Sequence, residues 1–154
     1  EKHFTRICNL IDPSKVVCGG DNNPGALQIA PTVMDNVTFG DAVMQEEIFG
    51  PVAVVIKFHD EDEVVAMAND SEYGLGGAVW TKDINKAIRV ARNVETGRMW
   101  VNTYNQIPEH SPFGGYKTSG IGRETHKMIL NHYTQVKNIM INLSYAPSGF
   151  YPQD

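Results

Sequence analysis

Residues 76–103, GGAVWTKDINKAIRVARNVETGRMWVNT, decide the fold class of this chain. The apolar runs at 76–80 and 99–103 each predict a β-strand. Between them, Asp83 is a suitable helix N-cap, and Gly97 is a natural stop for the helix. The helix itself is predicted by apolar residues at the i, i+3, i+4 and i+7 positions: Ile84, Ala87, Ile88 and Ala91. A strand–helix–strand unit with so long a crossover predicts a parallel pair of strands.

The same alternation extends in both directions from this unit. We expect further helices at 2–12, 60–69 and 123–132, and further strands at 15–18, 28–34, 52–58 and 136–143. The strand at 52–58 begins with consecutive apolar residues, which is typical of a strand covered on both faces of a parallel sheet. The sequence therefore predicts an α/β fold in which a mainly parallel sheet is flanked by helices.

Composition and charge limit the classes of function. The chain has 154 residues, 13 basic and 18 acidic, and a net charge of −5, which argues against a nucleic-acid partner. Its longest aliphatic run, 52–56, is far shorter than the roughly 20 residues that cross a bilayer, so no membrane partner is expected. Cys8 and Cys18 are predicted to be small core residues in a reducing compartment. Because no secretory signal is visible either, we expect a cytoplasmic protein.

Signatures of phosphate loops and metal sites fail on inspection. Gly115 and Gly120 have the spacing of a P-loop, but residues 121–122 stand where Lys and Ser or Thr are required. Gly120 and Gly122 begin like a dinucleotide-binding fingerprint, but Thr125 takes the place of the third glycine. No His, Cys or Asp cluster has the spacing of metal ligands, so no metal site is predicted.

Two longer segments carry the most specific information. They are QEEIFGPV at 45–52 and SPFGGYKTSG at 111–120. In this order, and about sixty residues apart, they closely resemble the C-terminal part of the catalytic domain of the aldehyde dehydrogenase superfamily. The resemblance covers about residues 2–143. It implies an enzyme that oxidises an aldehyde to a carboxylic acid with NAD or NADP.

Smaller matches support the same family. They are NDSEYGL at 69–75 and the pattern of Gly97-Arg98 followed by Val101-Asn102. Residues from 2 to about 51 are most similar to the class 3, fatty-aldehyde enzymes of the family. From about residue 60 onward the chain is more similar to bacterial enzymes of the acetaldehyde-oxidising type. The resemblance therefore leaves the substrate class open.

The first segment has two interpretations. From the residues alone, it is a turn that enters a buried strand, with Ile48 and Phe49 packed inside. The family resemblance implies instead that Glu47 and Phe49 bind the nicotinamide end of the cofactor. Glu47 would accept hydrogen bonds from the ribose hydroxyls, since each carboxylate oxygen can accept from one hydroxyl. Phe49 would lie against the nicotinamide ring and fix its distance from the substrate.

The second segment also has two interpretations. Its glycines permit unusual backbone conformations, and Phe113 could simply be a core residue. The resemblance implies that Phe113 is an aromatic wall of the aldehyde pocket. It also implies a variable lip that shapes substrate preference: Tyr104, Asn105, Gln106 and Ile107. We interpret His110, in the same stretch, as a loop histidine and not as a general base.

The family's catalytic cysteine and general base are expected upstream of this chain, so no catalytic residue is predicted within it. The chain begins at Glu1 and not at Met, and we expect its N-terminus to be truncated or to lie upstream. The isolated chain is therefore predicted to be inactive. Two alternatives remain open: a stand-alone, non-catalytic remnant that binds a partner or nucleotide, and a designed or proteolytic fragment.

The resemblance also divides the chain. Residues 1–134 are expected to form the C-terminal part of the catalytic domain, and residues 135–154 an oligomerisation strand with an extended tail. Ile139, Ile141 and Leu143 alternate along this strand. An exposed edge strand invites pairing with another chain, so we expect a homo-oligomer.

Overall fold

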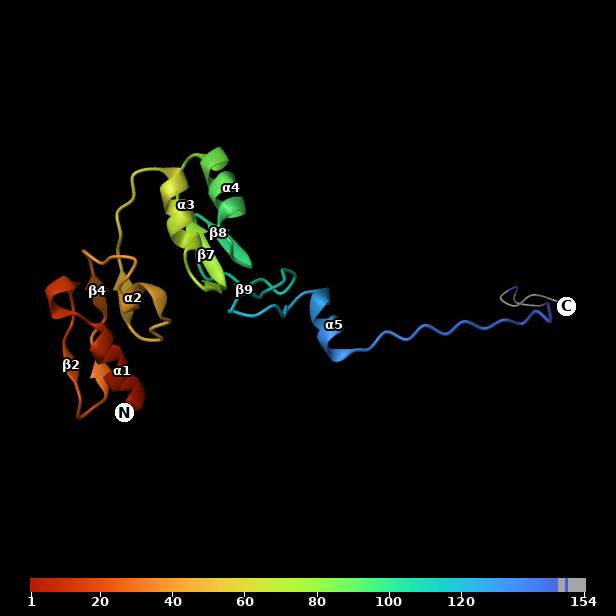
Figure 1. The fold of residues 1–154 in the computed structure, drawn as a ribbon, viewed down its shortest axis with the longest axis horizontal. Coiled ribbons are helices and arrows are strands. Elements are labelled where there is room, and N and C mark those ends of the chain that lie inside the picture. The colour runs from red at the N-terminus through yellow and green to blue at the C-terminus, as the bar shows by residue number, and fades with distance from the viewer. Residues whose placement is uncertain (147–148, 150–154) are drawn as a thin grey trace.

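The computed structural model describes residues 1–146 and 149. Its helices and strands form two lobes (Figure 1). The first lobe contains a three-stranded sheet in the order β1-β4-β5, in which β4 is antiparallel to β1 and parallel to β5. A small antiparallel pair, β2 and β3, lies beside helix α1. The elements of this lobe are α1 (Lys2–Leu10), a 3₁₀ turn (Pro13–Lys15), β1 (Val16–Cys18), β2 (Asn22–Asn23), β3 (Gln28–Ile29), β4 (Thr32–Met34), α2 (Ala42–Gln45) and β5 (Val52–Val54).

The core of the first lobe is small. Ile7 of α1, Met34 of β4 and Val43 of α2 are its buried apolar side chains. Thr32 is also buried, and its hydroxyl donates to the carbonyl of Ala30 and accepts from the N–H of Gly20. Its polar group is therefore satisfied, as burial requires.

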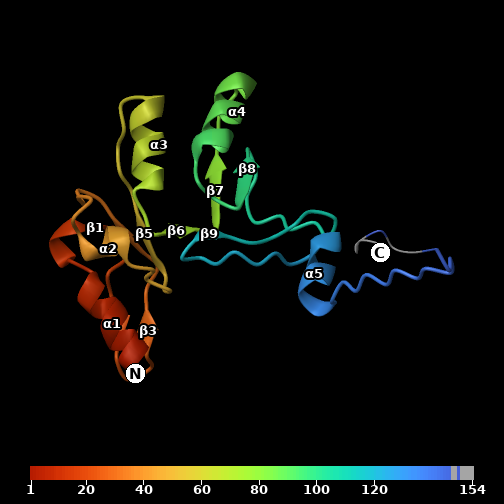
Figure 2. The same cartoon turned by 45° about the vertical axis from the view of Figure 1, so that its right-hand side comes forward.

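The second lobe is built around the unit predicted at 76–103. Strands β7 and β8 are parallel neighbours, and α4 covers them with the fully buried Ala87 (Figure 2). Asp83 caps its helix as predicted, because its carboxylate accepts from the N–H groups of Asn85 and Lys86. Asp60 caps the preceding helix in the same way and accepts from the N–H of Glu63. The elements are α3 (Glu61–Asn69), β6 (Tyr73–Gly74), β7 (Gly76–Val79), α4 (Ile84–Asn93), β8 (Arg98–Val101), β9 (Tyr116–Lys117), a 3₁₀ turn (Lys127–Ile129) and α5 (Leu130–Tyr133).

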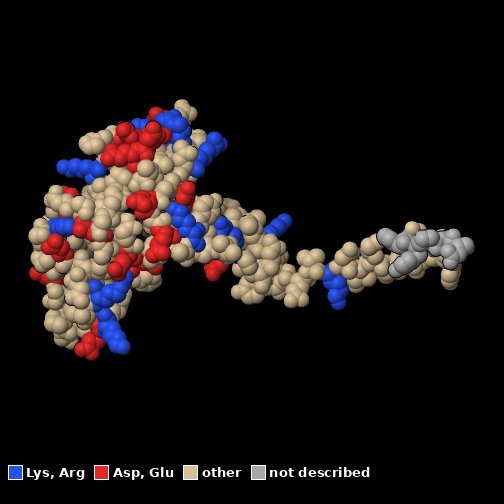
Figure 3. Space-filling model, in the orientation of Figure 1, with Lys and Arg blue, Asp and Glu red and all other residues tan. Residues whose placement is uncertain are grey.

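The predicted α/β class is confirmed, and both crossover pairs, β4–β5 and β7–β8, are parallel. Antiparallel pairing is added where β1 meets β4, in the β2–β3 hairpin, and where β6 meets β9. The acidic side chains in the first turn of α3 lie near the top of the second lobe (Figure 3).

Several of the predicted strand and helix limits are wrong. The strand expected at 28–34 is interrupted and forms β3 and β4. The strand expected at 52–58 ends at Val54, and Val55 and Phe58 are 51% and 53% exposed. Consecutive apolar residues here do not indicate a strand covered on both faces by this chain. Helix α4 ends at Asn93, four residues before Gly97.

The helix expected at 123–132 is confined to the 3₁₀ turn and α5. Its first part is extended, since Glu124 and Phe113 exchange backbone hydrogen bonds in an antiparallel bridge. Thr125 and His126 then adopt positive φ angles of 56° and 52°, which no α-helix can contain.

The strand expected at 136–143 does not form within this chain. Val136 is 100% exposed and Ile139 is 70% exposed, and the segment extends away from the second lobe (Figure 1). A strand needs a partner for its backbone N–H and C=O groups, and none of the described residues supplies one. Residues 147–148 and 150–154 of the predicted tail lie outside the described residues.

Two further expectations can be compared with the structure. Cys18 is exposed, so its assignment to the core is wrong, whereas Cys8 is partly buried. The second position of β1 is also exposed, which leaves this edge strand open to solvent. Among the described residues, no helix is both long and apolar enough to cross a membrane.

Candidate functional site

The residues predicted to contact the cofactor lie in a short connection between α2 and β5, residues 46–50, which we call the Glu-Phe segment. Arg6 of α1 holds its backbone from one side. The Arg6 guanidinium donates to the carbonyls of Ile48 (3.0 Å) and Glu47 (2.9 Å), and to Oε2 of Glu46 (3.1 Å). One side chain thus fixes consecutive residues, which the planar donor fork of arginine makes possible.

His3 continues this anchor along the same helix. Its Nε2 lies 2.8 Å from the carbonyl oxygen of Phe49, and it carries the shared hydrogen because a carbonyl only accepts. Phe49 itself has a φ angle of 56°, a conformation that costs energy for a residue with a side chain. The contacts from α1 therefore hold the segment in a shape that it would not adopt by itself.

This anchoring leaves both predicted contact groups free. Glu47 is exposed, and within the described part of the chain its carboxylate takes part in no hydrogen bond or ion pair. Phe49 is 77% exposed as a residue. The interpretation in which Phe49 packs inside is therefore wrong. A carboxylate and an aromatic face stand two residues apart on a fixed backbone, where a diol and a flat ring could bind.

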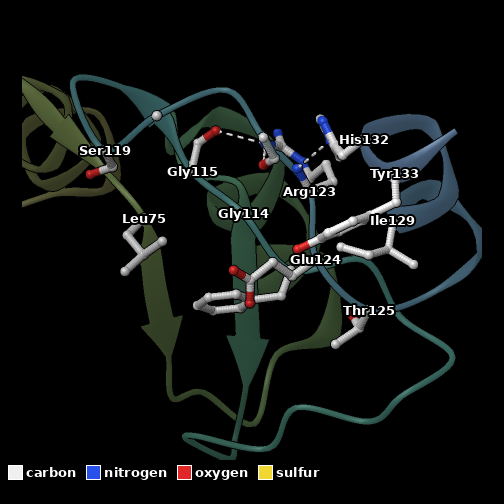
Figure 4. Close-up of a pocket in the computed structure, with 13 residues that line it drawn as sticks. Leu75, Gly114, Gly115, Ser119, Arg123, Glu124, Thr125, Ile129, His132 and Tyr133 are labelled. Carbon is white, nitrogen blue, oxygen red and sulfur yellow. Dashed lines mark hydrogen bonds between the residues drawn. The ribbon is translucent and has the colours of Figure 1, made fainter. Parts of the chain in front are cut away.

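Phe113 lies in the second lobe, in the bridge with Glu124. It lines a cavity of about 840 Å³ together with residues of the glycine-rich stretch and of α5 (Figure 4). Arg123 stiffens this wall, because its guanidinium donates to the carbonyls of Gly115 and Gly122 (both 2.9 Å). Its backbone N–H donates to Nε2 of His132 at 3.2 Å.

Asn105 and Ile107 lie apart from this cavity, on an exposed stretch without regular structure, residues 104–112. This stretch contains the predicted lip residues 104–107, and from here on we call all of it the lip. Ile107 is 46% exposed, and Asn105 has a φ angle of 56°. His110 is also exposed on the lip. The lip connects β8 to the bridge at Phe113, and its residues 104–110 are exposed.

The residues predicted to contact the cofactor and those predicted to contact the aldehyde lie in different lobes. Phe49 lines a shallow cavity of about 440 Å³ with residues of α1 and β3, whereas Phe113 lines the cavity described above. Gln45 joins the lobes by a long hydrogen bond of 3.5 Å to the carbonyl of Asp70. No group of three or more possible metal ligands occurs among the residues that the structure describes.

Sequence reasoning missed the residues that hold these segments. His3 and Arg6 are three apart and so share one face of α1, a spacing that is visible in the sequence. Their partners lie 40 or more residues away, and nothing in the pattern connects the two stretches. In the sequence, Arg98 is recognisable only as part of the Gly97-Arg98 motif, and nothing there indicates that it is buried.

Comparison with known proteins agrees with the sequence resemblance. The model of the aldehyde dehydrogenase family matches residues 2–139. An acetaldehyde dehydrogenase of Pseudomonas aeruginosa is 53% identical over 98% of this chain, which spans 32% of that protein. An aldehyde dehydrogenase of Vibrio cholerae is 48% identical over 90% of this chain and 28% of its own length. The chain thus spans about a third of the length of these relatives.

Solved structures give the same result. The NAD-dependent aldehyde dehydrogenase of Sinorhizobium meliloti superimposes with a TM-score of 0.90 at 32% identity, covering 98% of this chain and 31% of that one. An aldehyde dehydrogenase of Mycobacterium tuberculosis complexed with NAD⁺ gives a TM-score of 0.84 at 40% identity, covering 95% and 32%. This chain belongs to the aldehyde dehydrogenase family.

Proposed function

We propose that this chain is the C-terminal part of the catalytic domain of an NAD-dependent aldehyde dehydrogenase that oxidises an aldehyde to a carboxylic acid. In this proposal Glu47 and Phe49 bind the nicotinamide end of NAD. Phe113 forms a wall of the aldehyde pocket, and Asn105 and Ile107 belong to its entrance. The observation that carries the proposal is the anchored Glu-Phe segment, whose carboxylate and ring remain free.

The residues present fit the nicotinamide end of the cofactor. The ribose has two neighbouring hydroxyls, and the unpaired carboxylate of Glu47 can accept from both. The exposed ring of Phe49 offers a flat apolar face to the nicotinamide. When bound, NAD supplies the hydride acceptor. The protein's own part here is to hold the ring at a set distance, on which the rate of transfer depends steeply. We prefer NAD to NADP because the solved relatives are described as NAD-dependent or as NAD⁺ complexes.

The same proposal holds that the isolated chain is inactive. Its accessible surface is 11871 Å², whereas a compact protein of 17.1 kDa exposes about 7,800 Å². The exposed segment 136–143 contributes to the excess, and so do large apolar side chains such as Trp80 and Tyr133. Such surface is normally covered by other polypeptide.

We propose that residues 1–134 pack against the remainder of a catalytic domain. Residues 135–154 would pair with another subunit of a cytoplasmic homo-oligomer. The substrate would be a short aldehyde such as acetaldehyde, because the Pseudomonas aeruginosa relative at 53% identity is an acetaldehyde dehydrogenase.

The test is a chimera in which this chain replaces the matching third of the Pseudomonas aeruginosa acetaldehyde dehydrogenase; we call it the chimeric enzyme. We expect it to form reduced NAD when acetaldehyde is added, and the isolated 154-residue chain to form none. Glu47→Gln should raise the KM for NAD about tenfold, because the hydrogen bonds from both ribose hydroxyls lose the charge of the carboxylate. Asp62→Asn, an exposed acid on α3, is the matched control and should change nothing.

The outcomes separate the parts of the proposal. A folded chimeric enzyme without activity would contradict the assignment to the catalytic domain. An active chimeric enzyme in which Glu47→Gln behaves like Asp62→Asn would contradict the role of Glu47 alone. Activity of the pure 154-residue chain would contradict the expectation that further polypeptide is required.

A further inference from the structure

Arg98 is a buried cation without an acidic partner. Its residue is 8% exposed, at the start of β8. Within the described part of the chain, no carboxylate lies within ion-pair distance of its guanidinium. Burying a charge is costly unless hydrogen bonds satisfy it. The groups that accept hydrogen bonds from the buried guanidinium therefore indicate the role of Arg98.

The partners of Arg98 are backbone carbonyls, and all of them belong to the lip. One guanidinium nitrogen donates to the carbonyl of Gln106 at 2.9 Å. The other terminal nitrogen donates to the carbonyls of Pro112 (3.0 Å) and Ser111 (3.3 Å). One side chain thus joins the middle of the lip to its far end.

Aromatic rings complete the arrangement. The guanidinium carbon lies 5.2 Å from the ring centre of Phe113 and 5.7 Å from that of Trp100, both within cation–π distance. Trp100 donates from Nε1 to the carbonyl of Gln106 at 2.8 Å, so this carbonyl is held twice. The ring of Trp100 also lies 5.4 Å from that of Tyr104 at the other end of the lip.

We propose that Arg98 is a positioning residue that fixes the aldehyde entrance and thereby sets the preference for small aldehydes. This inference rests on the proposed function and deepens it. The lip has no regular structure of its own, and these ties hold its Gln106 and Pro112 carbonyls in addition to the backbone hydrogen bond from His126 to Glu109. Lysine could not replace them, since it carries one ammonium group in place of a planar fork. Phe113, the pocket wall, is held by the same guanidinium and moves with the lip when the ties are lost.

The chimeric enzyme provides the test, with Arg98→Met, Arg98→Lys and the control Arg92→Met, which removes an exposed arginine of α4. Arg98→Met should raise the KM for acetaldehyde about tenfold or more, because charge-assisted hydrogen bonds are lost. The KM for NAD should stay unchanged. Arg98→Lys should lie between the parent and Arg98→Met. The preference for acetaldehyde over a bulkier aldehyde, benzaldehyde, should fall in the same order.

A second readout does not depend on activity. Backbone amides of the lip should exchange with deuterium faster in Arg98→Met than in the parent or in Arg92→Met, while those of β4 and α1 exchange as before. If Arg98→Met does not fold, Trp100→Phe supplies the milder variant. It removes the indole donor to Gln106 and should loosen the lip in the same direction, to a smaller extent.

Several results would overturn the inference. One is a folded Arg98→Met enzyme with the parent's KM for acetaldehyde and the parent's exchange in the lip. Another is an equal rise of both KM values, which would indicate general damage. Failure of the proposed function looks different: the parent chimeric enzyme would then be inactive, while the exchange of the lip would still decide the role of Arg98.

Discussion

Arg6 and Arg98 hold two different regions of this molecule with the same chemical group. Arg6 donates to backbone carbonyls of a segment far away in the sequence. Arg98 donates to backbone carbonyls of the lip, which has no regular structure. Arg6 has a side chain that is 41% exposed and forms an ion pair with Glu46. Arg98 is buried and is satisfied by carbonyls and ring faces. The Glu-Phe segment is thus held by a side chain at the surface, whereas the lip is held by a buried one.

The largest effect should come from the backbone that supports the lip. A Cβ atom at Gly97 would overlap the carbonyl oxygen of Gly114, and neither backbone can yield easily. A Cβ at Gly50, in the Glu-Phe segment, would lie 2.6 Å from Cδ1 of Ile7, the flexible end of a side chain. We expect Gly97→Ala to destabilise the fold by about 3 kcal/mol and Gly50→Ala by about 1 kcal/mol.

Melting temperatures of the chimeric enzyme measure this difference. Gly122→Ala is the control, because a Cβ there has no atom within 4 Å. Equal melting temperatures for Gly97→Ala and Gly50→Ala would remove the contrast between the two regions.

The next effect concerns Arg6. Arg6→Met should raise the KM for NAD about fivefold, since a half-exposed cation contributes roughly 1 kcal/mol through its hydrogen bonds and ion pair. The KM for acetaldehyde should stay constant, which is the opposite of the pattern expected for Arg98→Met. The measurement is steady-state kinetics of the chimeric enzyme with Arg92→Met as control. A change in the KM for acetaldehyde as large as that for NAD would show that the two regions are not held separately.

Much of the fold could be predicted because its signals are local. Asp60 and Asp83 are N-caps that lie directly before the helices they indicate, and the 76–103 unit contains both of its strands. The wrong predictions have one physical cause. The structure of these segments depends on contacts with residues that are distant in the sequence. The segment at 136–143 alternates like a strand but has no partner among the described residues, and Gly97 is required by its close approach to Gly114 and not by the end of α4.

The candidate site was predicted unevenly for a similar reason. Glu47, Phe49 and Phe113 were identified by the family resemblance, and their roles stay predictions. Their supports could not be found in this way. An arginine on a helix is usually a solvated surface residue, and only the folded chain shows that Arg6 reaches residues 46–48. The exposure of Phe49 likewise depends on contacts with α1 and not on its apolar neighbours.

The smallest effect should appear in acid, and it provides a last comparison of the two lobes. In the first lobe, Lys15 donates to Asp41 at 2.7 Å, and this bond is the main cause that lowers the pKa of Asp41. In the second lobe, hydrogen bonds from Arg89 lower the pKa of Glu61. A carboxyl whose pKa is lower in the folded state stabilises the fold above its unfolded pKa. That stabilisation is lost as the pH falls through the folded pKa.

The window therefore lies below the ordinary carboxyl pKa of about 4. Above it, Asp41→Asn and Glu61→Gln should each melt slightly lower than the parent. As the pH falls through the window, the difference from the parent should shrink toward zero for both variants. The melting temperature of Arg98→Met should stay below that of the parent by the same amount throughout, because the carbonyls that bind Arg98 do not titrate. Melting temperatures measured across this range test the contrast directly. A deficit of Arg98→Met that faded in acid like that of Glu61→Gln would mean that Arg98 depends on a carboxylate after all.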